Sequence, residues 1–173
     1  MRPPAFVLLL LLTAPGCKKA GGDDLGSIEL HVDGKTVSLS KGEASFHPGT
    51  DGNHKLSLFS HDGELNRLVV ELESGAPSVA EWVGKPVQGL DYAEQNPEKK
   101  KLGVNRDINR FRDGSKYYEG YHVAGTVRSA TDAEVRVDLD SVFLEFSDTD
   151  EGDEATGREV PVKGSMRLPL TVR

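Results

Sequence analysis

Apolar and polar side chains alternate in short runs along most of the chain, and clusters of turn-forming residues separate the runs. The alternation is clearest at 28–32 and at 37–39, with Asp33 and Gly34 between them. Strict alternation over a few residues predicts a strand with one buried face. An Asp-Gly pair between two such runs predicts a β-hairpin with a two-residue loop.

The loop length also predicts the register of this hairpin. Leu30 is expected opposite Val37, and Ile28 opposite Leu39, so that all four side chains point to one face. A shift of one residue would turn the whole apolar set into water, because successive side chains of a strand point to opposite faces.

Further runs of the same kind predict strands at 44–46, 56–58, 68–72, 117–127, 135–139, 142–146 and 160–172. Short strands separated by turns about every ten residues are typical of antiparallel sandwiches and barrels. Nothing in the pattern indicates strands that alternate with helices. We therefore expect an all-β fold with one domain over 28–173, an antiparallel β-sandwich or a barrel-like form of it.

One segment breaks the strand pattern. Ser78 is followed three residues later by Glu81, the spacing of a capping box, and Gly84 can end a helix after about one turn. We expect a short helix over 78–83 in which Trp82, the only tryptophan of the chain, closes one end of the core. A platform for a ligand is the alternative role for this side chain.

Two irregularities are expected in the second half of the chain. The apolar positions change parity between 135–139 and 142–146, which predicts a β-bulge near Asp140 and Ser141. Pro161 and Pro169 remove backbone donors from the last run, so we expect that strand to lie at an edge or to be bent.

Two segments repeat a short pattern of valine, glycine, a hydroxyl residue, an apolar residue and arginine. They are 123–128 and 162–167, with glycines at Gly125 and Gly164. The repeat suggests two strands with equivalent roles, in which each glycine lies at a close backbone contact.

The first sixteen residues have the layout of a secretory signal peptide. Arg2 is followed by an apolar run at 5–12 and then by small and turn-forming residues. The apolar run is far shorter than the ~20 residues that a membrane-spanning helix needs. We therefore expect 1–16 to be removed on export.

The end of this leader, Thr13-Ala14-Pro15-Gly16-Cys17, resembles the lipobox of bacterial lipoproteins, and Cys17 is the only cysteine of the chain. The resemblance implies lipidation of Cys17, with 17–27 as a flexible lipidated tether that links the domain to a membrane. By the same resemblance, Lys18 after the cysteine favours the outer membrane, facing the periplasm. A cleaved signal followed by an incidental cysteine is the alternative. The body also resembles the β-sandwich lipoproteins of bacterial envelopes, which implies no particular function.

The chain is acidic, with a formal net charge of −7. An acidic surface argues against nucleic acid as a partner. The one basic patch lies in the long, poorly patterned segment 89–115 and comprises Lys99, Lys100, Lys101, Arg106, Arg110 and Arg112. It is a candidate contact for an envelope protein, and solvated surface is the alternative. Part of this segment is expected to dock on the domain through its apolar residues, Leu102, Val104, Ile108 and Phe111.

Two groups of side chains were considered as metal sites. Asp148, Asp150, Asp153 and Glu154 lie around Gly152 and offer oxygen ligands of the kind that calcium takes, although an exposed acidic turn has the same composition. His47, His54 and His61 are spaced seven residues apart. A metal site would need a third ligand in fixed geometry beside His47 and His54.

No catalytic motif is present in the sequence, neither a nucleophile elbow nor a metalloprotease helix nor a phosphate-binding glycine loop. We therefore expect a lipid-anchored envelope protein with a non-enzymatic binding or structural domain and no cofactor. A calcium-binding or small-ligand-binding module that uses 148–154 is the alternative. A hydrolase, or an inhibitor of one, is the third hypothesis.

Overall fold

A computed structural model describes residues 24–50, 52–62, 66–89, 110–113, 116–149 and 152–173. This part of the chain forms eleven strands and one short 3₁₀ helix, so the predicted all-β fold is confirmed. The first half contains β1 (Ser27–Val32), β2 (Lys35–Leu39), β3 (Glu43–His47), β4 (His54–Asp62), β5 (Asn66–Ser74), η1 (Val79–Trp82) and β6 (Pro86–Gly89). The second half contains β7 (Arg110–Asp113), β8 (Lys116–His122), β9 (Ala124–Ala130), β10 (Glu134–Thr149) and β11 (Gly152–Val172).

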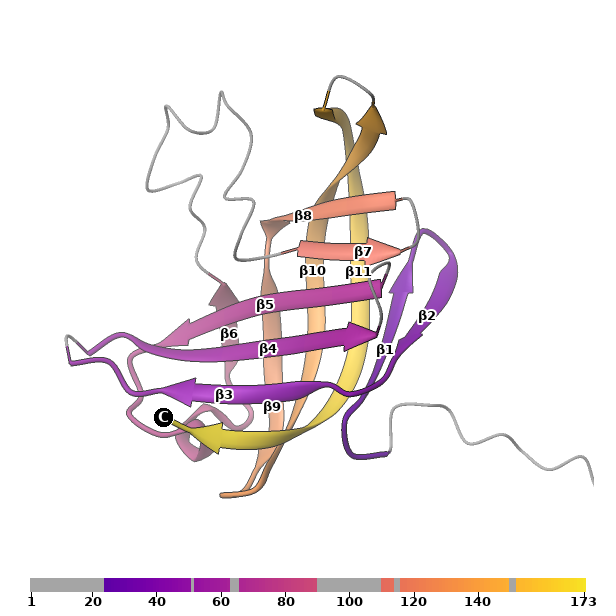
Figure 1. The fold of residues 1–173 in the computed structure, drawn as a ribbon. Coiled ribbons are helices and arrows are strands. Elements are labelled where there is room, and N and C mark those ends of the chain that lie inside the picture. The colour runs from indigo at the N-terminus through magenta and orange to yellow at the C-terminus, as the bar shows by residue number, and fades with distance from the viewer. Residues whose placement is uncertain (1–23, 51, 63–65, 90–109, 114–115, 150–151) are drawn as a thin grey trace, which may run out of the picture.

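The strands belong to one sheet in the order β2-β1-β11-β3-β4-β5-β6-β9-β10-β8-β7. Further pairings of β11 with β10 and of β5 with β7 connect strands that are distant in this order, so the sheet folds back on itself. In Figure 1, β3, β4, β5, β7 and β8 run across the front, and β6, β9, β10 and most of β11 run crosswise behind them. The two layers enclose the core.

The sheet is mixed, which corrects the prediction of purely antiparallel pairing. Each paired strand among the described residues is antiparallel to its neighbour except β3 and β11, which are parallel at 44–46 and 170–172. The long β11 makes this possible because it curves around the end of the molecule (Figure 1), so that 162–167 pair with β1 and 170–172 pair with β3.

The core follows the predicted alternation. In the first hairpin Leu30 pairs with Val37, and Ile28 pairs with Leu39, as the loop length predicts. Leu30 and Ile28 are fully buried. Asp33 and Gly34 both have positive φ, at 52° and 75°, the conformation that a two-residue turn of this kind requires. One continuous cluster of buried apolar residues, to which every strand contributes, fills the space between the layers.

The predicted short helix is present at Val79–Trp82. Trp82 is fully buried, donates a hydrogen bond from Nε1 to the Ala76 carbonyl oxygen at 2.9 Å, and lies edge-on to Phe46. Its role as a core residue is thereby confirmed. The Ser78 hydroxyl donates to the Glu81 carboxylate at 2.9 Å and makes no bond to the helix backbone, so the predicted capping box is not formed.

The irregularity predicted near Asp140 and Ser141 occurs slightly later in β10, where the register with β8 shifts between Val142 and Phe143 and the register with β11 shifts between Leu144 and Phe146. Buried positions keep one parity through β10 from Val135 to Phe143, and Ser141 occupies an inward position with 2 % exposure. A buried serine looks like an outward residue in the sequence pattern, which accounts for the offset.

The last strand was predicted to lie at an edge or to be bent. It is bent, and it does not lie at an edge. Its central part, 162–167, pairs with β1 on one side and with β10 on the other. Pro161 and Pro169 lie just outside this doubly paired part. Pro169 lies between the residues of β11 that pair with β1, which end at Arg167, and those that pair with β3, which begin at Leu170. On that side of β11 no neighbouring strand needs a backbone N–H from residue 169, so proline is tolerated.

The long polar segment contains a strand that the pattern did not predict. β7 follows 90–109, which lies outside the described residues together with Lys99, Lys100, Lys101 and Arg106. Phe111 in β7 is fully buried and stacks on Tyr118 at 5.5 Å between ring centroids. The predicted docking is therefore confirmed at Phe111, and Leu102, Val104 and Ile108 lie outside the described residues.

Candidate functional site

The strand register arranges the outer side chains of β11, β3, β4, β5 and β7 in rows that cross the strands. In one row Thr171 pairs with Ser45, Ser45 with Ser57, and Ser57 with Glu71. We call Thr171, Ser45 and Ser57 the hydroxyl row. On one side of it lies the row of Glu43, Phe59, Val69 and Arg110; on the other lie His47, Lys55 and Glu73.

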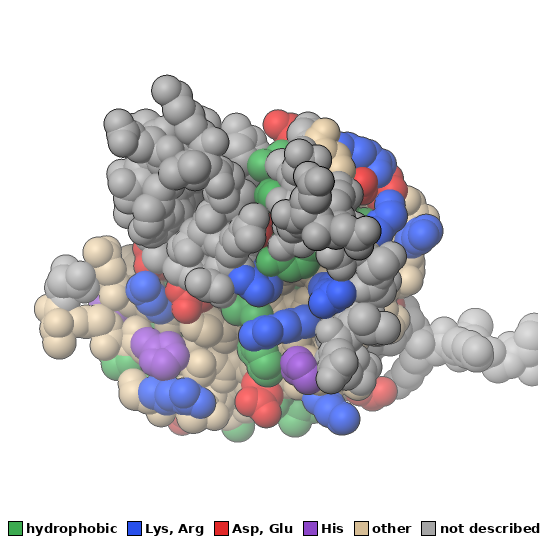
Figure 2. Space-filling model, turned by 45° about the horizontal axis from the view of Figure 1, so that its top comes forward, with side chains coloured by type: hydrophobic (Ala, Val, Ile, Leu, Met, Phe, Trp, Pro, Cys, Tyr) green, Lys and Arg blue, Asp and Glu red, His purple; other side chains and the backbone are tan. Residues whose placement is uncertain are grey.

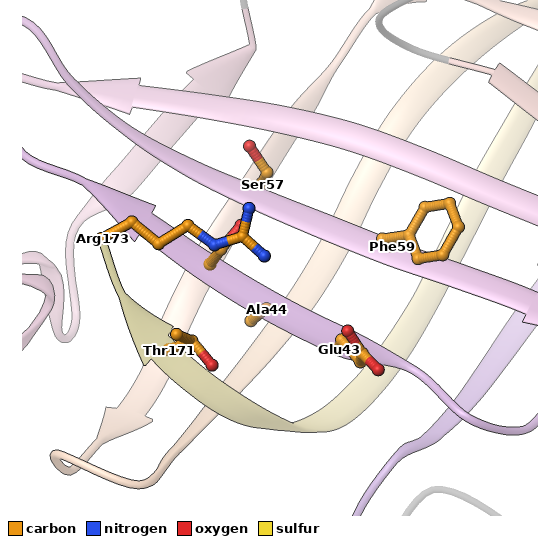
Figure 3. A pocket seen from close by; sticks show the side chains of 7 residues that line it. Glu43, Ala44, Ser57, Phe59, Thr171 and Arg173 are labelled. Atoms are coloured by element: carbon orange, nitrogen blue, oxygen red, sulfur yellow. The ribbon is translucent and has the colours of Figure 1, made fainter.

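The hydroxyl row forms the floor of a hollow because its side chains are shorter than those of both neighbouring rows. The hollow has a volume of about 340 Å³ and is lined by Glu43, Ala44, Ser45, Ser57, Phe59, Thr171 and Arg173. Figure 3 shows the Arg173 side chain reaching from the end of β11 over β3, with Ser57, Phe59 and Glu43 around the same space. The backbone of Arg173 is fixed by a hydrogen bond from its N–H to the Phe46 carbonyl oxygen at 2.9 Å.

Polar contacts hold two of the floor residues in place. The hydroxyl of Ser45 lies 3.1 Å from His47 Nε2, and the hydroxyl of Ser57 donates to Glu71 Oε1 at 3.4 Å. Lys55 lies 3.4 Å from Glu73 and 3.9 Å from Glu71. The positive charge of Lys55 is therefore already balanced within the sheet.

Two charges at the hollow are not balanced in this way. Glu43 and Arg173 are exposed, and within the described part of the chain neither makes an ion pair. The hollow thus presents a carboxylate, a guanidinium, three hydroxyl groups and one aromatic side chain. Such a set can hold a small polar ligand.

The Phe59 ring supports two further polar side chains. The Arg67 guanidinium carbon lies 5.8 Å from its centroid, and the His61 ring is stacked on it at 6.4 Å. These residues continue the outer face away from the hollow, toward β5 and β7.

A second hollow of about 260 Å³ lies at the end of the molecule beside η1. Its lining is mostly apolar and includes Phe46, Val79, Leu170 and Val172, of which Val172 is 61 % exposed. It offers few groups that could orient a ligand, so the hydroxyl hollow is the better candidate site.

Of the predicted basic patch, only Arg110 and Arg112, both in β7, are described. Arg110 lies half-buried, with its guanidinium carbon 5.7 Å from the centroid of Tyr117. Glu119 pairs with it from β8 and is fully buried although it occupies an outer position of the sheet. Sequence reasoning missed Glu119, because a glutamate between Tyr118 and Gly120 in a strand gives no sign of burial.

The predicted acidic site is described only in its backbone. Asp148 pairs with Asp153, and Thr149 with Gly152, at the end of the β10–β11 hairpin. Glu154 pairs with Ser147, and Asp150 lies outside the described residues. Calcium binding at these four residues therefore stays a prediction.

The three histidines do not converge. His54 is buried, accepts a hydrogen bond from the Gly49 N–H at 3.1 Å and stacks on Phe46. His47 and His61 belong to the outer face. Within the described ranges no group of three His, Cys, Asp or Glu side chains could hold a metal ion.

A network of charges connects the first hairpin to the last. Arg158 on β11 binds Asp33 in the β1–β2 turn with two hydrogen bonds and contacts Glu145 at 3.0 Å. Lys116 lies 3.5 Å from the same Glu145. The hydrogen bond from Arg158 holds the pKa of Asp33 below its usual value, and Asp33 raises the pKa of Arg158.

Comparison with known proteins adds no relative. No protein-family model, no curated protein and no solved structure matches this chain. Among the helices of the described residues, none is long and apolar enough to cross a membrane. Cys17 lies outside the described residues, so its lipidation also stays a prediction.

Proposed function

We propose that this chain is an exported, lipid-anchored envelope protein whose β domain binds a small polar ligand without catalysing a reaction. The leader and the lipobox-like end at Cys17 support the anchor. The hollow over the hydroxyl row supports binding, and it is the observation that carries the proposed function.

The charges at the hollow define the class of ligand. Arg173 offers a planar fork of donors that suits a carboxylate, and Glu43 offers an acceptor that suits an ammonium group. Because both belong to one hollow of about 340 Å³, the ligand should carry both charges on one small molecule. Phe59 can contact its apolar part. A zwitterionic amino acid or dipeptide has this chemistry.

Calorimetric titration of the full chain with alanyl-leucine tests this function. We expect saturable binding that is lost when the dipeptide is N-acetylated or amidated. Binding should fall at least tenfold in Glu43→Gln and in Arg173→Gln, because each removes one half of the charge recognition.

A variant that fills the hollow provides the steric test. Ser57→Phe places a ring on the floor and should abolish binding, whereas Ser38→Phe, at an exposed position of β2, should not. The proposal fails if the dipeptide does not bind, or if Ser57→Phe binds it as tightly as the unchanged protein.

A further inference from the structure

The second hollow, beside η1, is built from four separate parts of the chain. They are the end of β3 with Pro48 after it, the segment 77–80 at the start of η1, the turn between β9 and β10, and the end of β11. In Figure 1 the end of β11 and the β9–β10 turn lie together at the lower end of the molecule. None of these parts forms the hollow alone, so it depends on the complete fold.

Backbone hydrogen bonds connect three of these parts and fix the shape of the hollow. The Leu170 N–H donates to the Ala133 carbonyl oxygen at 2.8 Å, which joins β11 to the β9–β10 turn. The Arg173 N–H donates to the Phe46 carbonyl oxygen at 2.9 Å, which joins β11 to β3. A ligand that enters a hollow of fixed shape avoids part of the entropy cost of ordering its walls.

Three polar side chains line the hollow, and two of them are already engaged. The Ser78 hydroxyl donates to the Glu81 carboxylate at 2.9 Å. The Thr131 hydroxyl oxygen accepts from two N–H groups of its own turn, at 3.1 and 3.2 Å. The third side chain is Asp132, which is exposed and makes no hydrogen bond or ion pair within the described ranges. Its carboxylate is therefore available to a ligand.

The rest of the lining suits an aromatic ring. Phe46, Val79 and Leu170 are buried, whereas Val172 is an apolar residue that stays largely exposed. A cavity of about 150 Å³ with a lining of this kind holds benzene. The second hollow, of about 260 Å³, therefore has room for a ring with a short side arm.

The charge of this hollow differs from that of the surface around the strands. The face shown in Figure 2 carries Lys, Arg, Asp and Glu side chains together, so charges of both signs lie close to one another there. Among the described residues that line the second hollow, Asp132 alone is charged. One carboxylate beside an apolar lining favours an apolar ligand with a single positive end.

We propose that the second hollow binds an aromatic amine. The ring lies against Phe46, Val79 and Leu170, and the ammonium group donates hydrogen bonds to the Asp132 carboxylate. The net charge of −7 adds a general attraction for a cationic ligand. This site does not depend on the proposed zwitterion site or on the lipid anchor.

Calorimetric titration of the full chain with 2-phenylethylamine tests the proposal, and we expect saturable binding. Three analogues separate the contributions of the ring and the charge. 2-Phenylethanol has no charge, phenylacetate has the opposite charge, and ethylamine has no ring. Each should bind at least tenfold more weakly than 2-phenylethylamine.

The matched variants are Asp132→Asn and Glu159→Gln. Glu159 is also an exposed carboxylate, but it lies in the first half of β11, opposite Leu144. We expect Asp132→Asn to weaken binding of 2-phenylethylamine at least tenfold and to leave 2-phenylethanol unchanged, because only the charged end loses its partner. Glu159→Gln should change neither affinity. The melting temperature of each variant checks that it is folded.

Three results would overturn the proposal. The first is the absence of saturable binding, or binding of 2-phenylethanol as tight as that of the amine. The second is an equal loss in Asp132→Asn and Glu159→Gln, which would show a diffuse attraction to an acidic surface and no defined site. The third is displacement of 2-phenylethylamine by alanyl-leucine, which would assign the amine to the hydroxyl hollow.

Discussion

Gly125 on β9 and Gly164 on β11 flank Leu139 of β10 from its two sides, each in register with it. The same row continues to Leu30 on β1, which pairs with Gly164, and to Val87 on β6, which pairs with Gly125. Large apolar residues and glycines therefore alternate along a row that crosses five strands. The repeat that contains both glycines reflects this equivalence, as the sequence suggested.

Gly164→Ala is expected to destabilise the fold strongly. A Cβ at this position would overlap the Glu29 carbonyl oxygen and lie 2.7 Å from Leu30 Cδ2, so strands β1 and β11 would have to separate. Overpacking of this kind costs about 1–3 kcal/mol in the free energy of unfolding. Chemical denaturation of the full chain measures it.

Gly75→Ala is the matched control, because its Cβ would meet only one backbone oxygen at 3.7 Å. We expect little change there. Equal stability of the two variants would contradict the close approach of β1 and β11 at Gly164.

Ser141→Ala is expected to loosen the junction between β8 and β9. The Ser141 hydroxyl accepts from the Ala124 N–H at 3.0 Å and donates to the Ala124 carbonyl oxygen at 2.9 Å, where the ladder between the two strands and β10 is interrupted. Loss of both bonds in a buried place costs about 1–3 kcal/mol.

Hydrogen exchange at the Ala124 amide reads this change directly and should accelerate in Ser141→Ala. Ser38→Ala, on the exposed side of β2, should leave the same amide unchanged. Unaltered protection of Ala124 in Ser141→Ala would show that the hydroxyl does not replace the missing ladder bonds.

Asp33→Asn is expected to remove a stabilisation that depends on pH. The Arg158 hydrogen bond lowers the pKa of Asp33 from its ordinary value of 3.8. The unfolded chain therefore takes up the proton first, so this contribution is complete above pH 3.8 and is lost as pH falls through the lower folded pKa. Asparagine keeps the shape and tolerates the positive φ of this turn.

Melting temperatures of the unchanged chain and of Asp33→Asn should thus differ at neutral pH and converge in strong acid. Asp132→Asn, in an exposed turn, serves as the control. A difference that stays constant across this range would disprove the ion pair as its cause.

The sequence pattern predicted those parts of the fold that depend on residues close together in the chain. The Asp33-Gly34 loop determined the first hairpin, and Trp82 followed from the break in alternation. Ser141 was misplaced because a buried hydroxyl that replaces backbone bonds looks polar in sequence. β7 was missed because four residues are too few to show a period.

The candidate sites depend on contacts between distant segments, and so they were not predicted. Thr171 and Ser45 meet only because β11 curves around to pair with β3, which no local pattern indicates. Likewise, Asp132 is an ordinary turn residue in the sequence. It lies at one hollow with Leu170 only because β11 passes beside the β9–β10 turn.

The calcium alternative has a simple test. The proposed function assigns no cation to the acidic segment, so we expect no heat and no change in melting temperature when calcium is added. A titration of the full chain measures both. Heat that disappears in Asp148→Asn would instead establish the acidic segment as a calcium site.

The lipid anchor is the central claim of the proposed function, and the mass of the intact protein from native membranes tests it most directly. The account predicts a chain that begins at Cys17, with the added mass of its acyl groups. It also predicts that Cys17→Ser loses both this mass and the association with membranes. A soluble, unmodified product from the unchanged sequence would contradict the account.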